Sequence, residues 1–124
     1  MKLQLSEVLN LNQTLKLIID DTTRKIDPLF KFRLLGIMKS IEGHVANFEI
    51  IRNEKINEYG TKAEDGSVSI AKDDLDTIKK FNDDLMTVIN SEVEINVSKL
   101  QAGEVFDHGV NAEYLVGLYP IMEE

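Results

Sequence analysis

Few side chains in this sequence could carry out chemistry, and the first candidates are the adjacent residues Asp107 and His108. A histidine that is oriented by an aspartate forms the acid–base part of a serine hydrolase triad. The chain has neither a Gly-x-Ser-x-Gly nucleophile motif nor a glycine-rich phosphate-binding loop to accompany the pair. We therefore interpret the pair as part of a surface loop, with a small hydrolase as a remote alternative.

The residue types that bind metals or carry redox chemistry are scarce. The chain has no cysteine, which excludes disulfides, iron–sulfur clusters, thiolate zinc sites and cysteine nucleophiles. Its histidines are His44 and His108, too few for a multi-histidine metal site. The acidic residues lack the spacing of a calcium loop. We expect no catalytic residues, no metal and no cofactor, and therefore a protein that is not an enzyme.

A basic cluster is the best candidate for a ligand-binding site. Arg24, Lys25, Lys31 and Arg33 surround Pro28, where a long helix is predicted to begin. The N-terminus of a helix offers unpaired N–H groups and a positive dipole, so an anion such as a nucleotide could bind there. The alternative interpretation is a solvated basic turn.

Charge is distributed unevenly along the chain, whose formal net charge is −8. Residues 1–62 contain 10 Lys+Arg and 8 Asp+Glu, whereas residues 63–124 contain 4 and 14. This acidic half, which includes Asp83 and Asp84, disfavours direct binding to duplex DNA and could instead imitate nucleic-acid phosphates.

The element with the strongest signal is a long helix. A chain of 124 residues has the size of a single domain, which we assign to residues 1–124. Asp27 and Pro28 form an N-cap followed by a proline at the first helical position, and Gly60 is placed as the C′ glycine. The predicted helix, residues 28–59, would be about 48 Å long, which exceeds the diameter of a compact domain of this size.

Apolar residues recur along this helix at steps of three and four, the spacing of a heptad-like seam. We assign as the seam and candidate interface Phe30, Leu34, Ile37, Ile41, Val45 and Phe48. Either the domain is elongated, or the seam is covered partly by another subunit of a homo-oligomer. Gly36 and Gly43 interrupt the helix and either allow a close helix approach or are tolerated.

Shorter elements surround the long helix. Residues 1–5 alternate as a strand does, and Ser6 is the predicted N-cap of a helix to residue 19. Asp65 and Gly66 predict a hairpin turn. A helix capped by Asp73 or Asp74 should then return antiparallel along the long helix to residue 90.

The remaining residues complete a small α+β fold. Residues 92–97 alternate strictly, which predicts a strand that can pair with residues 2–5. Asn111 should cap a short C-terminal helix that Pro120 ends. The predicted class is α+β, mainly helical: a long central helix packed antiparallel on a second helix, with a short N-terminal helix, a small sheet and a short C-terminal helix.

Residues 28–97 resemble small uncharacterised accessory proteins of tailed bacteriophages. The similarity rests on the end of the long helix (48–60, FEIIRNEKINEYG), the acidic turn (64–67, EDGS), the returning helix (81–85, FNDDL) and the strand (92–95, EVEI). It implies a phage-encoded accessory protein with no known chemistry, and no catalytic residue can be transferred from it.

Two functions follow as alternatives. The first is a non-enzymatic phage protein that acts through protein–protein contact, as a self-associating virion or assembly component. The second is an inhibitor of bacterial anti-phage defence that sequesters a nucleotide signal or acts as an acidic decoy. In either case we expect a phage, host or identical protein as partner, no membrane, and a location in the host cytoplasm or the virion, since no apolar run could span a bilayer.

Overall fold

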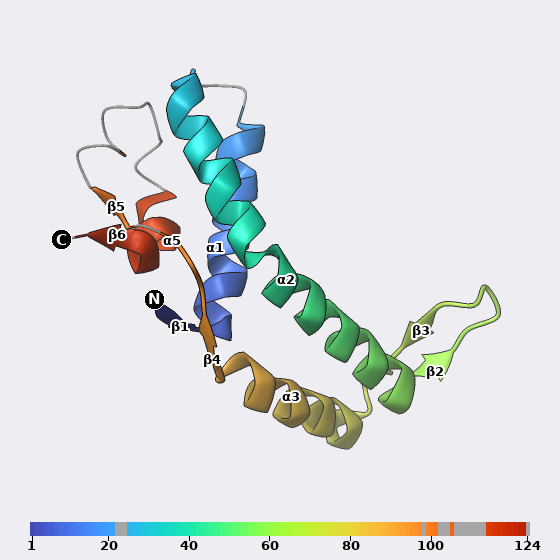
Figure 1. The fold of residues 1–124 in the computed structure, drawn as a ribbon. Coiled ribbons are helices and arrows are strands. Elements are labelled where there is room, and N and C mark those ends of the chain that lie inside the picture. Colours follow the sequence, from blue (N-terminus) through green and yellow to red (C-terminus); the bar gives the residue numbers. More distant parts are fainter. Residues whose placement is uncertain (22–24, 98, 102–104, 106–113, 124) are drawn as a thin grey trace.

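The computed structural model describes residues 1–21, 25–97, 99–101, 105 and 114–123 (Figure 1). The fold is α+β and mainly helical, as the sequence predicts. Its elements are β1 (Lys2–Gln4), α1 (Leu5–Asp20), α2 (Pro28–Tyr59), β2 (Thr61–Lys62), β3 (Val68–Ser69), α3 (Leu75–Ile89), β4 (Glu92–Glu94), β5 (Leu100–Gln101), α5 (Leu115–Leu118), a 3-10 turn (Tyr119–Ile121) and β6 (Met122–Glu123).

Helix α2 has the predicted bounds and start. The Asp27 carboxylate accepts a hydrogen bond from the backbone N–H of Phe30 at 3.1 Å, and Pro28 occupies the first helical position. The helix ends at Tyr59 and Gly60 follows it, as predicted, but the φ of Gly60 is −87°, outside the left-handed region usual for a C′ glycine. A glycine is needed there for a different reason: an added Cβ would lie 2.7 Å from Val68 Cγ1 of the following hairpin.

Helix α1 lies antiparallel along the first half of α2 (Figure 1). Its predicted N-cap, Ser6, is wrong, since α1 already begins at Leu5, directly after β1. Leu5 donates its backbone N–H to Ser91 O at 2.9 Å, and Gln4 donates its own to Glu7 Oε1 at 3.1 Å. Strand pairing and these two bonds together fix the start of the helix two residues earlier than an N-cap at Ser6 predicts.

The core joins α1 to the seam face of α2. The fully buried side chains of α1 are Val8, Leu11 and Leu15, with Ile18 at 1% exposure. On α2, the buried seam residues are Phe30, Leu34, Ile37, Ile41 and Phe48, and Val45 is half-buried. The seam is therefore the packing face of α2 within the chain, and its interpretation as a surface for another subunit does not agree with this burial.

Helix α3 returns along the second half of α2, after the β2–β3 hairpin (Figure 1). Asp74 caps it by accepting hydrogen bonds from the backbone N–H and the hydroxyl of Thr77. The hairpin turn is the predicted one, with Gly66 at a φ of 90°. Leu75, at the first position of α3, is 72% exposed.

Strand β4 pairs antiparallel with β1, which confirms the predicted pairing, with Lys2 opposite Glu94 and Gln4 opposite Glu92. The sequence did not indicate the parallel pair β5–β6, in which Leu100 lies opposite Met122. The described part of the predicted C-terminal helix is α5, which packs on α1; its predicted cap, Asn111, lies outside the described residues. Pro120 lies within the 3-10 turn that follows α5.

Among the described helices, none combines the length and the apolar character that a membrane span requires.

Candidate binding groove

A groove of about 550 Å³ lies against the first part of α2. One wall comes from α2 and the other from the segment that follows β4. The lining residues are Asp27, Leu29, Phe30, Phe32, Arg33, Gly36, Ile37, Ser40, Asn96 and Val97. This set is mostly apolar, as is usual for a surface that binds a ligand or a partner.

The sizes of the α2 side chains determine the shape of the groove. Phe30 and Ile37 are buried and belong to the core, whereas Leu29 and Phe32 are 76% and 74% exposed. Gly36 also lines the groove, and a Cβ added there would meet no atom within 4 Å, so this part of the groove is not filled. Two large apolar side chains therefore project into solvent beside an unfilled depression.

Three polar side chains of the groove, those of Asp27, Arg33 and Ser40, are bonded to the backbone. Asp27 accepts from the N–H of Phe30, Arg33 Nη2 donates to Lys99 O at 3.3 Å, and Ser40 Oγ donates to Gly36 O at 3.0 Å. The Arg33 bond connects α2 to the chain beyond β4, which supports the far wall. These contacts hold the groove in shape and leave its walls apolar.

Of the four basic residues proposed to bind an anion, Arg33 alone lines the groove in the part of the chain that the structure describes. Lys25 is exposed ahead of α2, Lys31 is half-buried, and Arg24 lies outside the described residues. The Asp27 carboxylate already accepts the N–H at the start of α2 that an anion would use. A carboxylate at this position disfavours a second negative group bound at the N–H groups of the helix terminus itself, by like-charge repulsion.

His44 has a structural role. Its ring Nε2 lies 3.0 Å from Glu94 O, so the half-buried ring joins the middle of α2 to β4. Asp107 and His108, the candidates for a hydrolase, both lie outside the described residues. In the described ranges, no three His, Cys, Asp or Glu side chains are placed to hold a metal ion.

A polar cluster joins α2 to α3 at the other end of the molecule. Tyr59 Oη donates to Asp84 Oδ2 at 2.6 Å, and Lys55 Nζ lies 2.8 Å from Glu58 Oε2 and 3.5 Å from Asp84 Oδ2. The hydrogen bond from Tyr59, assisted by the charge of Lys55, lowers the pKa of Asp84, and the same bond raises the pKa of Tyr59. The bond to Glu58, helped by Asp84, raises the pKa of Lys55.

Sequence reasoning missed both the groove and this cluster. For the groove, one signal was present: Leu29 and Phe32 are large apolar residues of α2 that do not belong to its seam. An amphipathic helix that is also apolar away from its packing face has a second surface to cover. For the cluster, the predicted antiparallel return of α3 brings residue 84 close to residue 59, but no local pattern selects that pair.

In comparisons with protein-family models, with curated proteins and with solved structures, none matches this chain.

Proposed function

We propose that this chain is a non-enzymatic phage accessory protein that acts through protein–protein contact, with the groove on α2 as its contact surface. The observation that carries the proposal is the exposure of Leu29 and Phe32, at 76% and 74%, beside the depression at Gly36. The phage origin is supported by the resemblance over residues 28–97.

The physical argument concerns the cost of these exposed side chains. Burial of one large apolar side chain contributes roughly 1.5–3 kcal/mol, so two adjacent residues left in water offer a partner a favourable contact. Energetically dominant interface residues are often aromatic and lie against apolar pockets, with polar groups at the rim. Phe32, the groove, Asp27 and Arg33 have this arrangement.

The partner that we propose is a second copy of the chain, which would make the protein a self-associating virion or assembly component. The buried seam of α2 cannot serve this purpose without opening the core. Outside the seam, the exposed Leu75 at the acidic start of α3 favours a second copy.

Size-exclusion chromatography with light scattering tests the proposal on the wild type, Phe32→Asp and Leu17→Asp. Leu17 is 51% exposed on α1 and does not line the groove, so its variant controls for a charge at an exposed apolar site. We expect the wild-type mass to rise with concentration, Phe32→Asp to keep the mass of one chain, and Leu17→Asp to behave as the wild type. If Phe32→Asp had the same mass as the wild type at every concentration, the proposal would be contradicted.

Sequestration of a nucleotide signal is a second candidate, favoured by one observation. The groove volume lies within the range of small-molecule sites, roughly 300–1,000 Å³, and the groove presents an aromatic ring and a guanidinium. The chain has no Trp and three Tyr, so a bound nucleotide would be evident as excess absorbance at 260 nm. Such an excess, lost in Arg33→Ala and kept in Lys39→Ala, would favour sequestration over protein contact.

A further inference from the structure

Another exposed apolar residue lies among acidic residues at the start of α3. Leu75 is 72% exposed, and Asp73, Asp74 and Asp76 flank it in the sequence. Asp74 is used as the helix cap, whereas the carboxylates of Asp73 and Asp76 belong to exposed residues. We call residues 73–76 the acidic tip. It presents a protruding leucine among negative charges.

The groove has the complementary character. Its lining is mostly apolar and contains one carboxylate, Asp27, and one guanidinium, Arg33. Lys31 on the same helical turns and Lys25 just ahead of α2 add positive charge beside it, so residues 25–33 carry three cations against one carboxylate. An apolar side chain that carries negative neighbours would meet both an apolar depression and positive charge here. Opposite charges across an interface guide the encounter and select the partner.

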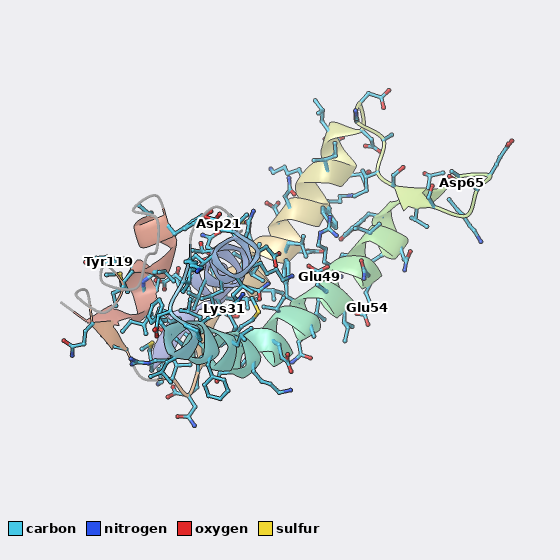
Figure 2. The ribbon with its side chains drawn as sticks, turned by 90° about the horizontal axis from the view of Figure 1, so that it is seen from above. Asp21, Lys31, Glu49, Glu54, Asp65 and Tyr119 are labelled. Carbon is cyan, nitrogen blue, oxygen red and sulfur yellow. The ribbon has the colours of Figure 1, made fainter. Side chains whose placement is uncertain are left out.

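The groove and the acidic tip lie at opposite ends of the molecule. The groove is at the first turns of α2, and α3 begins near the last turns of the same helix (Figure 1). In Figure 2, Lys31 lies in the left half of the view, whereas Asp65 of the hairpin lies far to the right. Because α2 is about 48 Å long, the tip cannot reach the groove of its own chain.

We infer, on the basis of the proposed function, that the acidic tip of one copy docks into the groove of the next. Leu75 enters the depression at Gly36, beside Phe32, while Asp73 and Asp76 face the basic residues around the groove. The contact uses two different surfaces, so a pair of copies keeps one free groove and one free acidic tip. Such head-to-tail contacts produce rings or open chains of subunits.

A symmetric dimer through two grooves agrees less well with the charges. It would place the basic residues around one groove against the same residues of the other copy, and like charges across an interface oppose association. The head-to-tail contact places opposite charges together.

The contact should also be a small one. We expect one helix start to bury less than the roughly 800 Å² per partner of a stable interface, so assembly should be weak, concentration-dependent and sensitive to salt.

The test uses two variants that each lose one surface. Phe32→Asp disables the groove and keeps the acidic tip, whereas Leu75→Asp disables the tip and keeps the groove. We expect each variant alone to have the mass of one chain by light scattering. An equimolar mixture should have the mass of two chains and grow no further, because one intact groove and one intact tip combine once. Leu17→Asp serves as the control that still assembles.

The outcomes separate the inference from the proposed function. If Phe32→Asp abolishes association and Leu75→Asp does not, the groove still binds a partner but the head-to-tail contact is wrong. A mixture of the two monomeric variants that stays monomeric also overturns the head-to-tail contact. If Phe32→Asp assembles as the wild type does, or the wild type stays monomeric at every concentration, both proposals are wrong.

A second pair of variants keeps the test valid if Phe32→Asp fails to fold. Lys31→Glu and Asp76→Lys each reverse one charge at the surface, and each should weaken assembly. The double variant restores opposite charges across the contact and should recover it. If the double variant did not recover assembly, the charge pairing would be contradicted. The same holds if assembly of the wild type were unchanged in ~1 M salt, where the Debye length is only about 3 Å.

Discussion

Tyr59 and Asp84 show how a single pair of side chains holds two helices together. The hydrogen bond between them is 2.6 Å long and joins the last residue of α2 to the middle of α3. A hydrogen bond to a charged acceptor is shorter and stronger than a neutral one. The pair lies in the part of the molecule with few buried apolar side chains, so its contribution to the packing of α3 is correspondingly important.

Replacement of Asp84 by Asn should lower the urea concentration at the unfolding midpoint at pH 7. The pKa of Asp84 is lowered in the folded state, so its stabilisation is present above the unfolded pKa of about 3.9 and is lost as pH falls through the folded value. The difference from wild type should therefore shrink at about pH 2, measured by urea denaturation with circular dichroism.

Asp83→Asn is the matched control for this prediction. Asp83 is adjacent, on the same helix and exposed, and its side chain makes none of the bonds that Asp84 makes. If Asp83→Asn lowered the urea concentration at the unfolding midpoint as much as Asp84→Asn does, the effect would come from the loss of a negative charge on α3. It would not come from the loss of the bond from Tyr59.

At the scale of elements, the packing of α5 on α1 depends on Gly117. A Cβ added at Gly117 would overlap the side chain of Thr14, whereas a Cβ at Gly43 would meet nothing within 4 Å. The first glycine is required by the contact between two elements. The second is an exposed glycine in the interior of α2, where glycine costs up to about 1 kcal/mol relative to alanine.

We therefore expect opposite effects from two identical substitutions. Gly117→Ala should lower the free energy of unfolding by about 1–3 kcal/mol, the usual cost of overpacking. Gly43→Ala should raise it by up to about 1 kcal/mol. Urea denaturation of both variants measures the difference. Equal stability of the two variants would mean that α5 does not press on α1 at this position.

The elements also show what the sequence could predict. The starts of α2 and α3 and the β2–β3 turn were predicted because their signals are local: Asp27 with Pro28, Asp74, and Asp65 with Gly66. The Ser6 cap failed because pairing of β1 with a strand about 90 residues away fixes where α1 begins. The pairing itself was predicted from the alternation of both segments, but the residue at which the strand ends and the helix begins depends on the bond from Leu5 N–H to Ser91 O, which no local pattern indicates.

The groove was missed for the same reason. Its wall on α2 can be predicted from the apolar residues that lie outside the seam. Its other wall, formed by Asn96 and Val97, comes from a segment far along the chain. The four basic residues predicted a binding site at the start of α2, which is where the groove lies. The carboxylate of Asp27, however, already accepts the N–H at the helix terminus that the predicted anion would have used. What disfavours an anion site is therefore local, the cap at Asp27, whereas the groove itself depends on tertiary structure.

At the scale of the whole molecule, burial is graded along one continuous helix. Five residues of α2 are buried, from Phe30 to Phe48, and none of its residues beyond Phe48 is. The first part packs on α1 and the core, whereas the last part packs on α3, whose one buried residue is Leu85. Local stability follows buried apolar contacts, so the two halves of α2 should open at different free energies.

Hydrogen exchange followed by mass spectrometry checks this gradient, and it also bears on assembly. We expect amides of residues 34–48 to exchange slowest and those of residues 52–59, the hairpin and the acidic tip to exchange fastest. If the tip docks into a neighbouring groove, protection of residues 75–78 should rise with protein concentration in the wild type and stay constant in Phe32→Asp. Uniform exchange along α2 would contradict the gradient, and concentration-independent exchange of the tip would contradict its docking.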